Sequence, residues 1–443
     1  MKVTAQSPQK QFDNPILQAL AAFAKDRGVQ LYLVGGSVRD LFLGRQTTDI
    51  DFTLASDAIQ FAKAFAANIG AIAIVLEENP PTVRVIVKQD NTPQTPQLSM
   101  DFAQFRAASL TDDLRLRDLT INAMAITLED MEAFTNTAGK QILSRVIDPC
   151  GGKKDLETGV LRFPSKQVVV ADPVRLLRIY RFAAQLDFEI SQDAIDLVMA
   201  YRSMLSDVAA ERCREELMKI FHVKKAHPYL QQMEASGLLR QLIPSIKEAH
   251  RVWISLETFE EDPIPMPLWA YREEINRYLQ EELSVGINRC SLIKFSLLLG
   301  DNLGGIGEGL RFSRKAVQFM ECLISGSKKL KNTIPQLTHK EMNRFLRTYA
   351  SDWWGILLYS AAAYPIDPAI LKQIADTYYE HILPIYKQGR LITGDDLIQE
   401  FHLKEGEKIG ELLKEIENRQ FDGEIRTREE AFAAVAALIQ KHS

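Results

Sequence analysis

The pattern of apolar and polar positions changes along this chain, and the first third has the pattern of a mixed α/β domain. Short runs rich in apolar and β-branched residues, bounded by Gly, Pro or polar turns, predict strands at residues 30–34, 48–55, 71–76, 82–88 and 98–105. Helical spacing predicts a helix at residues 16–25 and another from a cap at Ser56 to about residue 68, ended by Gly70. These elements suit one small sheet with helices packed on one side.

From about Asp172 onward the apolar spacing becomes helical. Residues 174–185, 209–221 and 287–299 repeat apolar positions roughly every 3.6 residues, and strand-like alternation becomes scarce. The proline-rich stretch 263–267 predicts a stiff break, and residues 389–393 predict a boundary before the last segment. The predicted fold class is therefore α+β, a small mixed sheet with helices followed by an all-helical remainder.

The chain is long enough for several cores, and its sequence predicts neither secretion nor a membrane span. Its 443 residues, 46% of them hydrophobic, predict roughly two to four domains. The first 15 residues are polar, and apolar runs stay shorter than about 18 residues. The four cysteines form no CxxC pair, which is typical of reduced thiols. We therefore expect a cytoplasmic protein without membrane contact.

The net charge of −5 argues mildly against a generally basic nucleic-acid binder, but local basic surfaces still matter for phosphate contact. Two groups of cations are candidates for such surfaces: Arg175, Arg178 and Arg181, and a cluster of Lys328, Lys329, Lys331, Lys340, Arg344 and Arg347. The pattern of the second cluster fits RNA contact and a solvated helical face about equally well.

The strongest signal for chemistry is a glycine pair followed by two carboxylates. Gly35 and Gly36 follow the apolar stretch 31–34, and without a Cβ the backbone there can come close to a phosphate. Asp49 and Asp51 stand at i and i+2 of the next strand, so both point to one face and can hold divalent cations together. Either motif alone is usually a turn or a solvated strand end, but their close order favours nucleotidyl transfer from a nucleoside triphosphate.

Four more segments add to this signal, at residues 117–123, 148–156, 172–178 and 211–217. In order, they are a charged pair before an apolar turn, a Gly-rich turn flanked by acids, a proline near a helix start and a charged helix. Together with residues 35–51, they resemble motifs A to E of the class II tRNA nucleotidyltransferases, the family of CCA-adding enzymes and bacterial poly(A) polymerases. The resemblance covers residues 35 to about 217 and is weak beyond them.

This resemblance implies a catalytic head of the DNA polymerase beta superfamily, followed by a helical neck, body and tail in a seahorse-like arrangement. We expect the head at residues 1–150, the neck at 151–226, the body at 227–385 and the tail at 386–443. The implied partners are the 3′ end of tRNA, bound through its acceptor stem and elbow, and CTP, joined by ATP in a complete CCA-adding enzyme. The implied cofactor is Mg²⁺, which prefers oxygen ligands.

The resemblance also assigns roles to the glycines and carboxylates of the head. Asp49 and Asp51 would bind Mg²⁺. Asp101, on the strand at 98–105, would serve as a third carboxylate or as a structural acid paired with Arg106 or Arg39, and both readings stay open. The residues expected to hold the triphosphate are Gly35, Gly36, Ser37 and Arg39.

The ribose and its surroundings involve a second set of residues. Asp118 resembles the acid that accepts a hydrogen bond from the ribose 2′-hydroxyl, with Arg117 and Asn122 in support. For Asn122, a helix cap or backbone anchor is an equally good interpretation. Arg178 completes the expected nucleotide-binding set.

The pair that would read the base is Asp172 and Arg175. At i and i+3 of one helix they would share a face. The carboxylate can accept from the amino group of cytosine or adenine while the guanidinium donates to the neighbouring acceptors, and guanine and uracil present the wrong arrangement. The alternative interpretation is that the two side chains form an ion pair within the helix and have no role in base recognition. The family usually has Glu before this Asp, whereas this chain has Ala171.

The product should depend on the segment between motifs A and B. Family members that add A to a CC end usually carry a flexible segment there, after the strand with the third carboxylate. Here only residues 107–112 precede the approach to motif B, which leaves little room for a lever. We therefore predict CC addition, with the A left to a separate A-adding enzyme, ahead of complete CCA addition and poly(A) synthesis. A catalytically dead RNA-binding homologue would be expected to lose Asp49, Asp51 or the glycines, and this chain retains them all. None of its seven histidines is followed by Asp, so the sequence predicts no phosphohydrolase activity.

Overall fold

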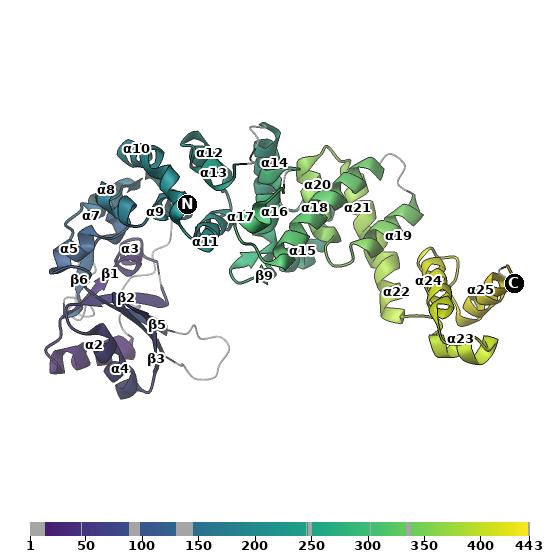
Figure 1. Ribbon diagram of the computed structural model, residues 1–443, viewed down its shortest axis with the longest axis horizontal. Coiled ribbons are helices and arrows are strands. Elements are labelled where there is room, and N and C mark those ends of the chain that lie inside the picture. Colours follow the sequence, from purple (N-terminus) through teal and green to yellow (C-terminus); the bar gives the residue numbers. More distant parts are fainter. Residues whose placement is uncertain are drawn as a thin grey trace. The chain divides into compact units, whose positions relative to one another are not determined.

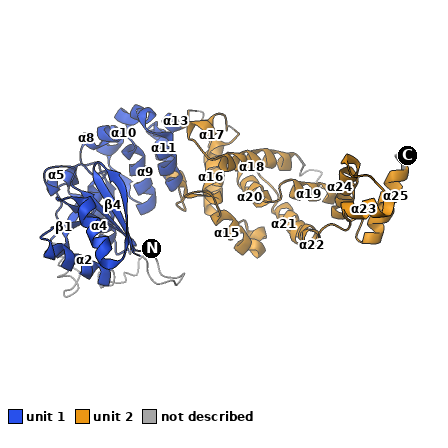
Figure 2. Ribbon diagram, turned by 60° about the horizontal axis from the view of Figure 1, so that its bottom comes forward, with its two compact units in different colours: residues 1–220, 229–242 blue, residues 221–228, 243–443 orange. Residues whose placement is uncertain are grey.

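The computed structural model describes residues 14–45, 47–87, 98–129, 145–244, 246, 250–301, 303–333 and 338–441. These residues belong to two compact units (Figure 2). Unit 1 comprises residues 1–220 and 229–242, and unit 2 comprises residues 221–228 and 243–443. The finer division into head, neck, body and tail stays a prediction. No helix in the described part of the chain is long and apolar enough to cross a membrane.

Unit 1 begins with a six-stranded mixed sheet. Its strands are β1 Leu31–Val34, β2 Asp49–Leu54, β3 Ile72–Glu78, β4 Pro81–Val87, β5 Leu98–Gln104 and β6 Ala125–Thr127. Their order is β3-β4-β5-β2-β1-β6, and only β2 and β5 are parallel neighbours. The five strands predicted from the sequence are confirmed. The prediction missed β6, which has only three residues and is defined by its pairing with β1.

Two helices cover one face of this sheet and leave the carboxylates on the other. The helices of this part of unit 1 are α2 Pro15–Asp26, α3 Gly36–Phe42 and α4 Ala58–Ile69. α2 and α4 lie on the same face of the sheet (Figure 1). Phe52 of β2 stacks on Phe102 of β5 at 5.4 Å, and Phe61 of α4 lies 5.8 Å from Phe102. Because side chains alternate along a strand, Asp49 and Asp51 point away from this aromatic core.

The cap of α4 differs from the predicted one. Asp57, not Ser56, is the N-cap, and its carboxylate accepts the backbone N–H groups of Ile59 and Gln60 at 2.9 and 3.0 Å. A carboxylate at this position satisfies two donors that the first helical turn leaves unpaired. Gly70 ends the helix with a φ of +67°, as the sequence predicted.

The rest of unit 1 is mostly helical. Its elements are α5 Leu110–Arg115, η1 Thr120–Asn122, α7 Gly152–Thr158, β7 Val160–Leu161, α8 Lys166–Ala171, α9 Arg175–Leu186, β8 Glu189–Ile190, α10 Gln192–Tyr201, η3 Arg202–Asp207, α11 Ala210–Phe221, α12 His227–Ala235 and α13 Leu238–Leu242. β7 and β8 form a small parallel pair. α8 ends before Asp172 because a residue that precedes a proline is disfavoured in the helical conformation, and Pro173 follows.

Unit 2 contains helices and one small hairpin. Its elements are α14 His250–Glu261, η4 Met266–Tyr271, α15 Arg272–Gln280, β9 Glu282–Ser284, β10 Ile287–Asn288, α16 Arg289–Leu299, α17 Ile306–Gly309, α18 Arg314–Thr333, α19 His339–Thr348, α20 Trp353–Ala363, α21 Pro368–Thr377, η6 Tyr378–Ile382, α22 Leu383–Gln388, α23 Gly394–Phe401, α24 Glu407–Phe421 and α25 Arg428–Lys441. The hairpin β9–β10 turns at Gly286, whose φ of +67° favours glycine. This hairpin and the β7–β8 pair make the remainder mostly rather than entirely helical.

Within unit 2, α18 and α20 pack closely because each presents a glycine to the other. A Cβ at Gly326 of α18 would lie 2.5 Å from Cδ1 of Ile356. A Cβ at Gly355 of α20 would lie 2.9 Å from Cδ2 of Leu323. Both separations are below any real carbon–carbon contact, so the two helices can approach this far only with glycine at these positions.

The end of unit 2 has a hydrophobic cluster of its own, shared by α23, α24 and α25. Its buried residues are Ile392, Leu397, Ile409, Leu412, Ile416, Ile425, Ala431 and Val435. α23 starts with a capping box in which Thr393 and Asp396 satisfy each other's backbone N–H groups. The boundary predicted at residues 389–393 therefore directly precedes a helix start.

Candidate active site on the open face of the sheet

The glycine pair lies directly beside the carboxylate strand. Gly35 follows β1 with a φ of +66°, and α3 begins at Gly36. A Cβ at Gly35 would lie 3.1 Å from Nη1 of Arg117 and 3.5 Å from Oδ2 of Asp51, so a side chain there would crowd both groups. The buried Ser37 hydroxyl accepts the backbone N–H of Asp51 at 2.9 Å. In this structure Ser37 therefore ties the glycine turn to β2.

The predicted carboxylates come together on neighbouring strands. Asp49 is exposed and Asp51 is half-buried, and Asp51 is paired in register with Asp101 on β5. Asp101 forms a bidentate ion pair with Arg84, with both N–O distances at 2.7 Å. The predicted alternative partners of Asp101 were wrong, because Arg106 binds Asp113 and Arg39 binds Asp40. Sequence reasoning could not see the Arg84 contact, because it joins two strands.

This concentration of negative charge changes the titration of Asp51. Burial, together with the nearby charges of Asp101 and Asp49, raises the pKa of Asp51 to about 6, against the opposing effects of Arg117 and Arg39. A carboxyl with this pKa is protonated in a large fraction of molecules just below neutral pH. A bound cation would remove the repulsion, so the site favours positive charge.

The donor set fits Mg²⁺ better than a soft metal. In the described ranges, no group of three or more His, Cys, Asp or Glu side chains could hold a metal ion by itself. Mg²⁺ in nucleotide sites commonly uses one or two carboxylates and takes its other ligands from water and substrate phosphates. Asp49 and Asp51 on one face of β2 match that requirement, whereas the oxygens of Asp101 are already bound by Arg84.

A buried polar network lies beside the glycine turn. Asp118 is 8% exposed and accepts the side-chain amide of Asn122 at 3.1 Å and the Arg178 guanidinium at 2.6 Å. Burial alone would raise the pKa of Asp118, but Arg178 and the hydrogen bond from Asn122 outweigh burial and hold the pKa below its usual range. The Asn122 oxygen accepts Nη1 of Arg39 at 2.9 Å. The structure thus brings together Arg39, Asp118, Asn122 and Arg178, as expected for a shared site.

The remaining cation of the predicted arginine group has another role. Arg181 is 8% exposed and forms an ion pair with Glu216 of α11 at 3.0 Å. Its guanidinium also lies 4.2 Å from the ring centre of Phe182. Arg39 lies over the same ring at 5.1 Å, so Phe182 connects α9 with α3. Arg181 is therefore a packing residue and contributes no basic surface.

Asp172 and Arg175 do not share a helical face, which corrects the sequence prediction. Asp172 follows α8 in an extended conformation with φ −149°, and Arg175 is the first residue of α9. Asp172 forms an ion pair with Arg212 at 2.9 Å, and Nη1 of Arg175 donates to the carbonyls of Leu116 and Val168. The intrahelical ion pair considered as the alternative is excluded by the same geometry.

One further acid of the site was missed by sequence reasoning. Asp113 of α5 is 1% exposed and forms ion pairs with Arg106 at 3.1 Å and Arg117 at 3.3 Å. Burial would raise the pKa of Asp113, but the two guanidinium groups more than compensate and lower the pKa. Asp113 thereby holds Arg117 against the glycine turn. The only signal in the sequence is the i, i+4 spacing of Asp113 and Arg117.

Comparisons with known proteins match most of the chain. The Poly A polymerase head domain matches residues 31–162, the probable RNA and SrmB-binding site of polymerase A matches residues 187–250, and the putative tRNA nucleotidyltransferase domain 2 matches residues 308–436. The CC-adding tRNA nucleotidyltransferase of Geobacter sulfurreducens is 30% identical over 431 residues, which is 94% of each chain. This chain belongs to the tRNA nucleotidyltransferase family. It is accordingly an enzyme of the nucleotidyltransferase class.

Other members of the family cover the chain to similar extents. The CC-adding tRNA nucleotidyltransferase of Synechocystis sp. is 27% identical over 92% of this chain and 94% of its own. The Multifunctional CCA protein of Neisseria gonorrhoeae is 31% identical over 49% of this chain and 50% of its own. The Thermotoga maritima CCA-adding enzyme complexed with tRNA has the same fold, with a TM-score of 0.69 at 22% identity over 98% of both chains.

The family's Gly-rich motif serves packing in this structure. Asp148 accepts the backbone N–H groups of Gly152 and Lys153 at 2.8 and 2.9 Å and so starts α7. A Cβ at Gly152 would lie only 2.0 Å from the carbonyl oxygen of Thr120. Thr120 also donates to Asp155 of α7 at 2.7 Å. This motif fixes the turn η1 that carries Asn122.

The predicted RNA-binding cations lie in unit 2 and are partly engaged with their own protein. Lys328 forms an ion pair with Asp301 at 3.2 Å, and Arg347 donates to Asn418 at 2.9 Å. Lys340 pairs with Asp422 at 3.0 Å. Lys329 and Lys331 lie 5.9 and 4.6 Å from the ring centres of Tyr349 and Tyr364, and Arg344 is exposed. RNA contact by this cluster stays a prediction.

Proposed function

We propose that this protein adds the two cytidines of the CCA end to the 3′ terminus of tRNA, using CTP and releasing pyrophosphate. The observation that carries the proposal is the short segment between β5 and α5. β5 ends at Gln104 and α5 begins at Leu110, so only residues 105–109 separate them. Two relatives that match more than nine-tenths of the chain bear the CC-adding name, which supports the same choice.

This short segment is tied down at both ends. The backbone N–H of Phe105 donates to Leu54 at 3.0 Å, and that of Arg106 donates to Asp113 at 3.0 Å. At the other end Ser109 caps α5 by accepting the N–H of Asp112 at 3.1 Å. A segment this short and this well bonded cannot act as the mobile lever of A-adding relatives.

The open face of the sheet supplies the groups that nucleotidyl transfer needs. The tRNA 3′-hydroxyl attacks the α-phosphorus of CTP, a new phosphodiester bond forms, and the bond to pyrophosphate breaks. Asp49 and Asp51 would hold Mg²⁺, which when bound lowers the pKa of the attacking hydroxyl and neutralises charge on the triphosphate. The backbone at Gly35 and Gly36, together with Arg39, would orient the triphosphate. Unit 2 would contact the rest of the tRNA through its shape and phosphates.

We propose that Asp172 and Arg175 select the base. Each side chain would first have to leave the partners that it has in this structure. Asp172 gives up its ion pair with the exposed Arg212 to accept the amino group of cytosine. Arg175 turns from the carbonyls of Leu116 and Val168 to the base acceptors. We expect Asp172→Ala to reduce the preference for CTP over UTP by at least tenfold, measured as the ratio of the two kcat/KM values. An unchanged ratio would refute the base-reading role.

The proposal is tested with tRNAs that end before the CCA, after the first C and after CC. Each is incubated with the protein, Mg²⁺ and CTP, ATP or both. Growth by two residues with CTP, and no extension of the CC-ended tRNA by ATP, is the expected result. Addition of the terminal A would identify a complete CCA-adding enzyme, the runner-up that the fold also supports. Asp49→Ala serves as the control, because it should abolish all addition.

A further inference from the structure

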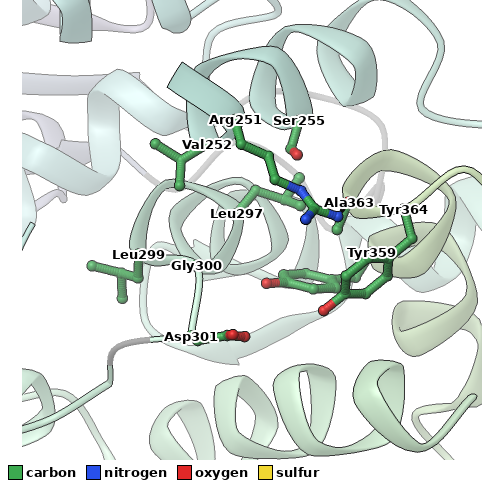
Figure 3. A pocket seen from close by; sticks show the side chains of 10 residues that line it. All are labelled: Arg251, Val252, Ser255, Leu297, Leu299, Gly300, Asp301, Tyr359, Ala363 and Tyr364. Atoms are coloured by element: carbon green, nitrogen blue, oxygen red, sulfur yellow. Dashed lines mark hydrogen bonds between the residues drawn. The ribbon is translucent and has the colours of Figure 1, made fainter. Parts of the chain in front are cut away.

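Unit 2 contains a cavity of about 380 Å³ that the proposed reaction does not use (Figure 3). It is formed by residues of α14, α16 and α20, with the chain that follows α16 and α20 closing one side. Val252, Leu297 and Leu299 give it apolar walls. Ligand sites in proteins generally measure about 300 to 1,000 Å³, so this cavity suits a small ligand such as one nucleotide.

The cavity lining includes side chains with hydroxyl groups. Tyr359 is 2% exposed and Ser255 is 6% exposed, and both residues line the cavity. In Figure 3 the Tyr359 and Tyr364 hydroxyls point to the same side of the cavity. Burial raises the pKa of Tyr359, so its hydroxyl stays a donor at neutral pH. Hydroxyl groups of a cavity lining can both donate hydrogen bonds to a ligand and accept them.

One cation and one anion complete the lining. Arg251 donates through Nη2 to the carbonyl of Ala363 at 2.8 Å and lies 5.2 Å from the Tyr364 ring centre, which leaves other N–H groups for a ligand. Asp301 supplies a carboxylate. This acid makes the cavity a poor site for a simple anion. A nucleobase, by contrast, has flat apolar faces and an edge with both acceptors and an amino donor, as in guanine, cytosine and adenine.

The rim of the cavity carries two cations of the predicted RNA-binding cluster. Nζ of Lys328 lies 3.2 Å from the Asp301 carboxylate, and Nζ of Lys331 lies 4.6 Å from the Tyr364 ring centre. Both lysines come from the last turns of α18, which packs against α20. Phosphates bound by these lysines would therefore place an attached base next to the tyrosines.

We propose that this cavity receives one unstacked nucleotide of the RNA substrate, with the base inside and its phosphates on Lys331 and on Lys328, which would exchange the Asp301 carboxylate for a phosphate. RNA-binding proteins commonly read unstacked bases against aromatic and arginine side chains. The inference rests on the proposed function in one respect, that the substrate is tRNA. It adds a recognition site far along the chain from the carboxylates of the head.

The test measures binding of labelled tRNA to the full-length protein in EDTA, which keeps the transfer reaction out of the measurement. Arg251→Met keeps the aliphatic stem and removes the guanidinium, and Tyr359→Phe removes only a hydroxyl. Arg251→Met should weaken binding by roughly tenfold, and Tyr359→Phe by several-fold. Arg314→Met, which removes an exposed cation of α18 outside the cavity, is the matched charge control and should change binding less than twofold. Circular dichroism melting verifies that each variant is folded.

The outcomes separate this inference from the proposed function. If the wild-type protein adds cytidines but Arg251→Met and Tyr359→Phe bind tRNA as tightly as wild type, the cavity inference fails and the proposed function stands. If both variants lose affinity while the wild type adds no cytidine, the cavity inference stands and the proposed function fails. Calorimetry with the four nucleoside 5′-monophosphates distinguishes the source of the ligand. A monophosphate that binds in an Arg251-dependent way without competing with tRNA would assign the cavity to free nucleotide and overturn the RNA inference.

Discussion

The ionised carboxyl of Asp51 destabilises the folded protein when no cation is bound, and the same carboxyl would bind a cation when one is present. Its pKa is raised to about 6 by burial and by the charges of Asp101 and Asp49. A carboxyl whose pKa is raised on folding stabilises the protein only at low pH, and this contribution is lost as the pH rises through the folded-state value. At neutral pH the ionised Asp51 therefore opposes folding unless a cation is present.

We expect Asp51→Asn to increase the free energy of unfolding of the metal-free protein by up to about 3 kcal/mol at pH 7.5. The gain should shrink as the pH falls below about 6 and disappear near pH 4, because the wild-type carboxyl is then protonated. Urea unfolding in EDTA at several pH values measures both effects. Added Mg²⁺ should stabilise the wild type more than the variant. A variant less stable than wild type at pH 7.5 would contradict the charge-repulsion account.

Arg84 is a positioning residue for the same site. Its bidentate bond to Asp101 neutralises one of the charges that act on Asp51. We expect Arg84→Met to move the acidic limb of the pH profile of kcat/KM for CTP to higher pH, because Asp51 then meets a bare negative charge. Arg84→Lys keeps the charge and should move the limb less. Identical profiles for wild type and Arg84→Met would show that Arg84 does not act through charge.

At the scale of the elements, α7 holds the turn η1 in place through Gly152. Gly152→Ala would place a Cβ 2.0 Å from the carbonyl oxygen of Thr120, so helix or turn must move. We expect a loss of stability of about 1–3 kcal/mol, typical of overpacking, together with weaker CTP binding because η1 carries Asn122. Thermal unfolding and CTP titration measure the two effects. Gly410→Ala is the matched control, because no atom lies within 4 Å of its Cβ position in α24. It should stabilise the helix by about 0.5–1 kcal/mol.

Local patterns decided which elements and site residues could be predicted. The alternation of a strand is fixed by the backbone, so Asp49 and Asp51 could be placed on one face without a structure. The local effect of Pro173 was available too, but the proline was taken to mark a helix start, whereas it also stops α8 before Asp172. Because α8 ends before Pro173, Asp172 and Arg175 do not lie on a common helix.

Contacts between distant elements were beyond sequence reasoning. Arg84 and Asp101 are 17 residues apart and meet only because β4 and β5 pair in this register. Arg178 reaches Asp118 across 60 residues. The charge of Arg84 among the valines of β4 was a signal that a partner existed, but the partner's identity depends on the tertiary fold. The cavity of unit 2 has no linear motif at all.

At the scale of the whole molecule, the proposed RNA binding by an acidic chain would depend on a few local cations. The net charge is −5, and cations such as Lys340 already pair with carboxylates of the protein. Such a protein should show a salt dependence of tRNA binding that reflects only its unpaired surface cations, since each neutralised phosphate adds about 0.7–0.9 to the slope.

We expect Arg344→Gln to lower the slope of log Kd against log salt by about one. Arg344 is exposed on α19, whereas Lys340 on the same helix is paired with Asp422 at 3.0 Å. Lys340→Gln removes the same charge and should change the slope less, because that charge is already compensated. Binding of labelled tRNA across a range of KCl concentrations provides the slopes. Equal slopes for wild type and Arg344→Gln would remove Arg344 from the RNA surface.

The glycine contacts between α18 and α20 also constrain how this sequence can evolve. Gly326 precedes Lys328 and Lys331 on one helix, and Gly355 precedes Tyr359 on the other. One inserted residue would rotate everything beyond it by about 100° and separate the rim from the cavity. Lineages descended from this sequence should therefore conserve the lengths of residues 326–331 and 355–359. Point substitutions at positions other than Gly326 and Gly355 can accumulate one at a time, but insertions and deletions would have to occur in neighbouring loops.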